Sequence, residues 1–196
     1  MADEGQVTFE SVPGFSGDIT SHFYPWLAKR LPERATFVEV GVLLGRSVAF
    51  LGELRPDLDL WAVDTWENGD REGEMAEYQK KYGPTTWMAF LRGMAEHSPA
   101  VFERLHVIRS RSVDVTVPLA DAAFIDAAHD YEGCAADIAH YRKLLKPGGI
   151  LCGHDYEGVH HSGVVQAVDE AFGGHHHIGP EGWQRGGYMS CWWWQA

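Results

Sequence analysis

The most informative part of this chain reads Thr36-Phe-Val-Glu-Val-Gly-Val-Leu-Leu-Gly-Arg-Ser47. Its first five residues are β-branched or apolar apart from Glu39, which predicts a buried strand over Thr36–Val40. Two glycines four residues apart follow, and then Ser47–Leu54 carries apolar residues at helical spacing. Glycine lets the backbone approach a ligand, and the start of a helix offers free N–H groups. The stretch therefore predicts a strand, a turn and a helix, with the turn serving either a ligand or only the tight connection.

The rest of the chain alternates between strand and helix patterns. Further strands are predicted over Leu58–Val63, Leu105–Arg109, Ala122–Ile125, Ile150–Cys152 and Tyr188–Trp194. Helices are predicted from Asp18 or Ser16 to about Leu31 with an interruption near Pro25, over Thr86–Glu96 after Pro84, along the face Cys134, Ile138, Tyr141 and Leu145 up to Lys146-Pro-Gly-Gly149, and over Gly163–Phe172. This alternation predicts an α/β fold, in which helices cover both faces of a mostly parallel sheet.

Composition narrows the class of protein. With 196 residues, 45% of them hydrophobic and 22% charged, the chain is expected to form one globular domain over residues 1–196. A net charge of −12 argues against nucleic acid as the main partner. Three cysteines without a CxxC motif fit a reducing compartment. No run approaches 18 apolar residues and no signal peptide is visible, so a cytoplasmic protein without a membrane partner is expected. A homodimer is left open.

In a parallel α/β sheet, ligands bind beyond the carboxyl ends of the strands. Glu39 and the two glycines stand at the first strand end, and Asp64, Thr65 and Trp66 at the second. A carboxylate at the second strand end suits a ribose diol, and Trp66 could lie against an adenine ring. The alternatives are that Asp64 caps a helix and Trp66 belongs to the core. Ser110, Arg111 and Ser112 follow the third strand and are further candidates for the adenine edge.

The fourth and fifth strand ends carry acids and histidines, in Asp126-Ala-Ala-His129 and in His154-Asp155. Asp126 and Asp155 could hold a divalent ion such as Mg²⁺, and His154 is a third candidate ligand that would favour a softer metal. His129 has the intrinsic pKa range of a general base. The alternative is that these residues cap helices. The tracts His160-His161 and His175–His177 are interpreted as polar surface runs.

Five pieces of the sequence together resemble class I S-adenosylmethionine-dependent methyltransferases. They are Glu39-Val-Gly-x-x-x-Gly-x-Ser47, Asp64, Phe124-Ile-Asp-x-x-His129, Lys146-Pro-Gly-Gly149 and Gly153-His-Asp-Tyr156. The chain is most similar to the small metal-dependent O-methyltransferases, which act on catechols, caffeoyl-CoA or the sugars of antibiotic pathways. The resemblance covers about Pro13 to Trp194 and implies a Rossmann-like three-layer sandwich, with a seven-stranded mostly parallel sheet whose last strand is antiparallel.

The resemblance also implies roles for single residues. The cofactor S-adenosylmethionine would be bound by Glu39, Gly41, Gly45, Arg46, Ser47, Asp64, Thr65, Trp66, Ser110, Arg111, Ser112 and Asp126. A divalent metal, Mg²⁺ before Mn²⁺, would be held by Asp126, His154 and Asp155, and His129 would be the general base. His154 departs from the carboxylates or amides usual in that family. The expected substrate is a small molecule with a hydroxyl group, such as a vicinal diol, a sugar or a catechol of natural-product biosynthesis.

Two other classes of function compete with this interpretation. A Rossmann oxidoreductase would use NAD(P), but the GxGxxG fingerprint is absent because Gly41 is followed by Val, Leu and Leu before Gly45. A non-catalytic protein with the same fold would not need acids and His129 at the strand ends. The acceptor cannot be read from residues 1–30, 67–100 and 157–187, although residues 1–30 are a candidate substrate lid.

Overall fold

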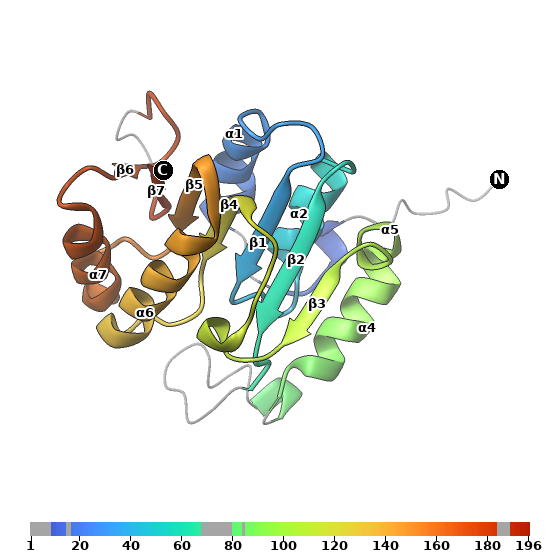
Figure 1. Ribbon diagram of the computed structural model, residues 1–196. Helices are drawn as coiled ribbons and strands as arrows, with labels where there is room; N and C mark the ends of the chain where they lie inside the picture. The colour runs from blue at the N-terminus through green and yellow to red at the C-terminus, as the bar shows by residue number, and fades with distance from the viewer. Residues whose placement is uncertain (1–8, 15–16, 68–79, 84, 184–188) are drawn as a thin grey trace.

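The computed structural model describes residues 9–14, 17–67, 80–83, 85–183 and 189–196. Within these residues the chain forms a seven-stranded sheet in the order β3-β2-β1-β4-β5-β7-β6, with helices packed against it (Figure 1). Ser16, residues 68–79, Pro84 and Tyr188, on which some sequence predictions depend, lie outside the described residues.

The central strands are parallel and the last ones are not. The strands are β1 Thr36–Val40, β2 Asp59–Asp64, β3 His106–Arg109, β4 Ala120–Ile125, β5 Leu145–Gly153, β6 His177–Ile178 and β7 Trp192–Gln195. Strands β3, β2, β1, β4 and β5 pair in parallel, whereas β7 is antiparallel to β5 and to β6. The predicted fold class is confirmed, including the antiparallel strand at the carboxyl terminus.

Helices cover both faces of the sheet. The α-helices are α1 Tyr24–Ala28, α2 Arg46–Leu54, α4 Trp87–His97, α5 Pro99–Phe102, α6 Tyr131–Tyr141 and α7 Ser162–Phe172. A π-helix, η2, spans Ile19–Phe23, and short 3-10 turns lie at η1 Phe9–Ser11, η3 Ser112–Asp114 and η4 Arg142–Leu144. None of the helices in the described part of the chain is long and apolar enough to cross a membrane.

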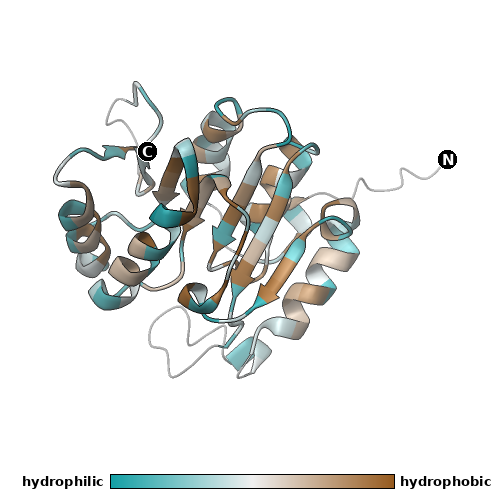
Figure 2. Cartoon of the chain, in the orientation of Figure 1, coloured by the Kyte–Doolittle hydropathy of each residue, from teal (hydrophilic) through white to brown (hydrophobic). Residues whose placement is uncertain are grey.

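Alternate residues of each strand supply two hydrophobic cores, because successive side chains of a strand point to opposite faces. Phe37 of β1 and Phe124 of β4 join the core that includes residues of α1, α2, α4 and α5. Val38 and Ile125 join the other core, with residues of α6 and α7. Figure 2 shows hydrophobic residues along the strands and hydrophilic residues on the outer turns of α6 and α7.

Strand β6 and helix α5 were not predicted, and predicted elements differ from the structure by more than two residues at three places. Helix α6 ends at Tyr141, and Leu145 is the first residue of β5, so the segment Lys146-Pro-Gly-Gly149 lies within β5 rather than stopping a helix. The amino-terminal helix is two pieces, η2 and α1, with Pro25 in the first turn of α1 as proline prefers. Strand β7 begins at Trp192, since Met189 to Cys191 have no strand conformation.

The carboxyl ends of four neighbouring strands lie side by side. Backbone hydrogen bonds join Gly41 N to Val63 O (2.9 Å) and Asp126 N to Val40 O (2.7 Å). His154 N donates to Ile125 O at 3.1 Å, which brings the end of β5 to the end of β4. The strand order reverses between β1 and β4, the position where open α/β sheets bind ligands.

Candidate active site at the carboxyl ends of the strands

Two glycines shape the turn between β1 and α2. Gly41 has φ +88°, and a Cβ there would lie 2.1 Å from the carbonyl oxygen of Asp126. Gly45 precedes α2 with φ +92°, and its Cβ would lie 2.6 Å from Met94 Sδ. Both positions need glycine, because a side chain would be strained there and would push the turn away from β4 and α4.

Glu39 lies in β1 and is 1% exposed. Its carboxyl group accepts hydrogen bonds from Tyr24 Oη (2.8 Å) and Ser47 Oγ (2.5 Å). Burial raises the pKa of Glu39 to about 8, although both hydrogen bonds oppose this rise. Glu39 therefore connects β1 to α1 and to the start of α2, and its predicted contact with the cofactor stays a prediction.

Asp64, at the end of β2, holds the glycine turn in place. Its carboxylate accepts hydrogen bonds from Leu43 N (2.8 Å) and Trp66 N (2.7 Å). The indole of Trp66 donates to Leu43 O at 2.7 Å, so two residues of the β2 end bind the same turn residue. A carboxylate has about four lone-pair sites, which leaves acceptor capacity for a ribose diol.

Trp66 is part of the core. It is 1% exposed, and its ring lies 4.8 Å from that of Trp87 and 4.6 Å from that of Phe90. This is the alternative considered from the sequence, and contact with an adenine ring would need movement of these neighbours.

The other candidates for cofactor binding are dispersed. Arg46 donates to Val12 O (2.6 Å) and Glu10 O (3.3 Å) of the amino-terminal segment. The backbone carbonyl of Thr65 accepts from Arg109 Nε, and Ser110 N donates to Asp64 O. Arg111 forms an exposed ion pair with Asp114, and Ser112 Oγ donates to Asp137 of α6. Of this group, Thr65 and Ser110 lie nearest Asp64 in the hydrogen-bond pattern.

The acids and histidines of the fourth and fifth strand ends form one cluster. His154 Nδ1 lies 3.1 Å from Asp155 Oδ1 and 3.8 Å from Asp126 Oδ1. His129 Nε2 lies 3.0 Å from Asp155 Oδ2. All four predicted residues are thus brought together, next to the backbone of Asp126 that Gly41 approaches.

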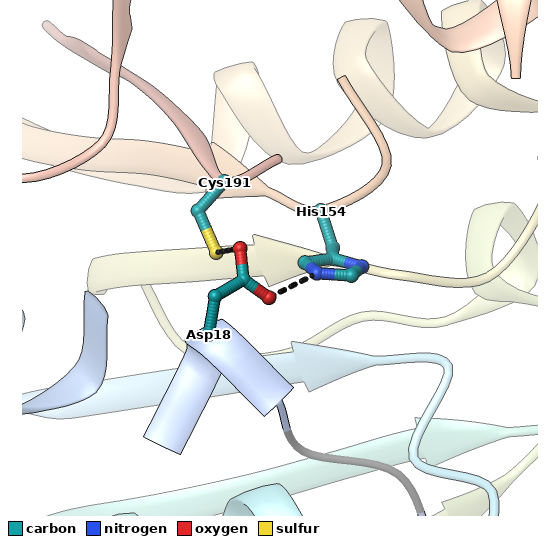
Figure 3. A group of neighbouring side chains, drawn as sticks. All are labelled: Asp18, His154 and Cys191. Carbon is teal, nitrogen blue, oxygen red and sulfur yellow. Dashed lines mark hydrogen bonds and ion pairs between the residues drawn. The ribbon is translucent and has the colours of Figure 1, made fainter. Parts of the chain in front are cut away.

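Asp18 completes this cluster from the amino-terminal segment. Its Oδ1 lies 2.9 Å from His154 Nε2 (Figure 3). Its Oδ2 accepts a hydrogen bond from Ser190 N at 2.9 Å. Ser190 Oγ lies 2.9 Å from the same His154 nitrogen. The sequence indicated Asp18 only as a possible start of a helix, and no local spacing could reveal a contact across 136 residues.

Each charged group in the cluster shifts the pKa of its neighbours. Burial disfavours charged His154, but hydrogen bonds to Asp155 and Asp18 outweigh it and raise the pKa of His154 to about 11. Burial would raise the pKa of Asp155 too, yet hydrogen bonds from His129 and His154 hold that pKa far below its usual range. Burial, reinforced by the charge of Asp155, raises the pKa of Asp126. Asp126 and Asp155 both face His154 Nδ1, which favours a cation there: the protonated imidazole itself, or a metal ion that displaces its proton.

These residues fit a divalent metal ion. One ligand atom each from Asp126, His154 and Asp155 lies within 4.8 Å of the others. Asp18 contacts the far nitrogen of His154, which is the usual arrangement of a metal-binding histidine and its supporting carboxylate. Two carboxylate oxygens suit Mg²⁺ or Mn²⁺, and the imidazole shifts the preference toward Mn²⁺ or a softer ion.

Comparison with known proteins identifies the family of this chain. A model of the methyltransferase domain family matches residues 38–156, more than half of the chain. No curated protein sequence matches the chain.

Several solved structures share the fold. CalS11, a TDP-rhamnose 3'-O-methyltransferase of calicheamicin biosynthesis, has a TM-score of 0.56 and 17% identity, covering 88% of this chain and 76% of that one. The O-methyltransferase NovP has a TM-score of 0.60 and 14% identity, covering 91% and 77%. Precorrin-6y C5,15-methyltransferase of Geobacter metallireducens has a TM-score of 0.58 and 13% identity, covering 90% and 81%. At these identities the likeness concerns the fold.

Proposed function

This chain belongs to the methyltransferase domain family and uses S-adenosylmethionine as its methyl donor, and we propose that it methylates an oxygen of a small molecule with the help of a divalent metal. The observation that carries the proposal is the contact between Asp126, His129, His154 and Asp155 beside the glycine turn. Acids and histidines in this arrangement suit metal binding and proton transfer at a hydroxyl group.

Each group has a part in the proposed reaction. The turn from Gly41 to Gly45 and the Asp64 carboxylate bind the cofactor, with Asp64 accepting from the ribose hydroxyls. Asp126, His154 and Asp155 would hold the metal, which would act as a Lewis acid that lowers the pKa of the substrate hydroxyl. His129 accepts the proton from the substrate, and Asp155, 3.0 Å from its Nε2, stabilises the imidazolium that forms. The substrate oxygen then attacks the methyl group in line with the departing sulfur.

The proposed acceptor is a small molecule with two adjacent oxygens, such as a sugar diol or a catechol. The O-methyltransferase activities named for CalS11 and NovP support an oxygen acceptor, and the calicheamicin pathway named for CalS11 supports a role in natural-product biosynthesis. The acidic net charge of −12 disfavours a nucleic-acid acceptor. Residues 1–30 are the proposed substrate lid in one catalytic domain, and Asp18 of this segment contacts His154. A cytoplasmic location suits an enzyme of this kind.

The first experiment measures methyl transfer from labelled S-adenosylmethionine to a panel of catechols and sugar nucleotides. A chelator should abolish turnover, and added Mg²⁺ or Mn²⁺ should restore it. Full activity in excess chelator would remove the metal from the proposal while leaving methyl transfer intact. No transfer to any oxygen acceptor, with transfer to a carbon or nitrogen acceptor, would overturn the choice of oxygen.

The second experiment tests the base. His129→Ala should lower turnover by roughly 10²–10⁴-fold, the usual effect of losing a general base, with nearly unchanged affinity for S-adenosylhomocysteine. His160→Ala, an exposed histidine outside the cluster, is the matched control. Near-normal turnover in His129→Ala together with a collapse in His154→Ala at unchanged metal content would move the base role to His154.

A further inference from the structure

His161 joins the cluster from a tract that the sequence indicated only as a polar surface run. It is the residue before α7, and its Nδ1 lies 3.4 Å from Asp155 Oδ1 and 3.0 Å from Glu157 Oε1. Its ring lies 4.6 Å from the ring of His129, edge to face. Nδ1 of His161 is itself buried and has no hydrogen bond of acceptable geometry among the described residues. A buried nitrogen facing two carboxylates in this way is arranged for a cation.

Three ligand atoms meet here in a second grouping. His129, Asp155 and His161 each offer one ligand atom, and these atoms lie within 4.8 Å of one another. Ligand atoms that each lie about 2.0–2.2 Å from one ion are at most about 4.4 Å from one another. The three atoms are therefore close to the spacing that a shared ion needs. The donor set differs from that of Asp126, His154 and Asp155, since it has two imidazoles and one carboxylate. Nitrogen-rich sets of this kind favour Zn²⁺ and other transition metals over Mg²⁺.

Packing holds both histidines in place. The segment before α7 is fixed by Glu157, whose carboxylate accepts hydrogen bonds from Val159 N (3.1 Å) and His160 N (3.0 Å). The start of α7 lies against the His129 loop, because a Cβ on Gly163 would be 2.8 Å from His129 O and 2.6 Å from Tyr131 N. The two imidazoles therefore need little rearrangement to share one ion.

We propose that His129, His161 and Asp155 form a site for Zn²⁺ or a similar transition metal, adjacent to the site of Asp126 and His154, and that an ion bound there inhibits methyl transfer. The inhibition follows because an imidazole that ligates a metal cannot accept a proton. This part rests on the proposed role of His129 as base, whereas the binding part does not. Asp155 belongs to both sites, so the inhibitory ion also competes for one ligand of the metal that supports the reaction.

Binding is tested by calorimetric titration of the metal-free protein with Zn²⁺, and by the visible absorption of Co²⁺ in its place. His161→Ala should weaken Zn²⁺ binding by at least about tenfold, since even a supporting residue of a metal site contributes about 10–100-fold. His160→Ala, one residue away and exposed, should bind Zn²⁺ like the parent. Asp126→Asn should keep this Zn²⁺ binding too, because Asp126 is outside the proposed ligand set.

Two outcomes of the titration would overturn the site. Unchanged affinity in His161→Ala would mean that the ion binds elsewhere, such as the tract His175–His177. Loss of Zn²⁺ binding in Asp126→Asn but not in His161→Ala would mean that Zn²⁺ takes the neighbouring metal site.

Inhibition is tested by measuring methyl transfer at saturating Mg²⁺ with increasing Zn²⁺, each variant being compared with its own rate without Zn²⁺. The parent and His160→Ala should be inhibited at the concentration that titrates the site, and His161→Ala should need at least about ten times more. Zn²⁺ binding at His161 without inhibition would overturn the inhibitory role and with it the base assignment of His129, while the metal site would stand. A protein active in excess chelator would refute the proposed metal requirement without affecting the Zn²⁺ titration.

Discussion

At the scale of single residues, Glu39 places an acid side chain in β1, an interior strand of the sheet. It is 1% exposed, and its hydrogen-bond donors are the hydroxyls of Tyr24 and Ser47. Such an environment favours the neutral form, as the pKa of about 8 expresses. A protonated Glu39 at neutral pH links three elements without burying a full negative charge.

This pKa predicts how stability depends on pH. Between about pH 4.5 and 8 the folded protein retains a proton on Glu39 that the unfolded chain releases, so the contribution of Glu39 to the free energy of unfolding falls as pH rises. Glu39→Gln has no such titration. The stability of Glu39→Gln relative to the parent should therefore increase from pH 5 to about pH 8, as measured by urea unfolding. Exposed Glu103→Gln is the control, and parallel curves for Glu39→Gln and the parent would contradict the prediction.

Asp64 is the residue on which cofactor binding is expected to depend most. Asp64→Asn should weaken binding of S-adenosylhomocysteine by about tenfold or more, because hydrogen bonds to a charged group contribute about 1.5–3 kcal/mol. Calorimetry measures the affinity, and Asp59→Asn at the other end of β2 is the matched control. If Asp64→Asn lowered the melting temperature but left the affinity unchanged, Asp64 would serve only the turn that it holds through Leu43 and Trp66.

At the scale of elements, the turn between β1 and α2 both packs against β4 and lies at the proposed ligand site. Strands β1 and β4 are adjacent and parallel, and the backbone of Gly41 passes directly against that of Asp126. The contact is backbone to backbone, so no side-chain rotation can relieve a clash there. A ligand above the turn could approach the main chain closely for the same reason.

Gly41→Ala tests this packing. A Cβ at 2.1 Å from Asp126 O, at a residue with φ +88°, should destabilise the fold by about 1–3 kcal/mol or prevent folding. Gly158→Ala is the control, since nothing lies within 4 Å of its Cβ position. Thermal unfolding of both variants measures the difference, and equal stabilities would show that β1 and β4 separate more easily than their pairing indicates.

At the scale of the whole molecule, hydrogen bonds among three polar residues join three distant parts of the chain. Asp18 precedes η2, His154 follows β5, and Ser190 precedes β7, yet their side chains and backbone contact one another at 2.9 Å. Hydrogen bonds to His154 and Ser190 outweigh burial and lower the pKa of Asp18. The amino-terminal segment is thereby attached to the cluster of acids and histidines.

Asp18→Asn is expected to weaken metal binding from a distance. An amide oxygen can accept from His154 or from Ser190 N–H, but its NH₂ group cannot accept from the other. Affinity for Mn²⁺, followed by electron paramagnetic resonance, should fall by roughly 10–100-fold, while affinity for S-adenosylhomocysteine should change little. Asp114→Asn, in an exposed ion pair, is the control. Unchanged Mn²⁺ affinity in Asp18→Asn would separate Asp18 from the metal site.

Much of the fold and part of the site were determined by local sequence. Six of the seven strands and the residues that follow them, among them Gly41, Asp64, Asp126 and His154, could be predicted because strand periodicity and turn glycines act over a few residues. The two-residue strand β6 was not predicted, since it is too short to show a periodicity. Once parallel strands are expected, their carboxyl ends lie at one edge of the sheet, so Asp126 and His154 were expected at the same edge. They are close because β4 and β5 are adjacent. The end of α6 was not predictable in this way, since Leu145 continues the helical spacing but pairs with Ala120 in the sheet.

Only the tertiary structure decided which distant residues complete the site. Trp66 could have been a cofactor platform or core, and its packing against Trp87 and Phe90 made it core. Asp18 contacts His154 because η2 is buried in the same hydrophobic core as β4 and β5. His161 contacts Asp155 because α7 packs against α6 and the His129 loop. Such contacts have no local signature: they form when separate hydrophobic faces are buried together, and the positions of the polar groups follow from that packing.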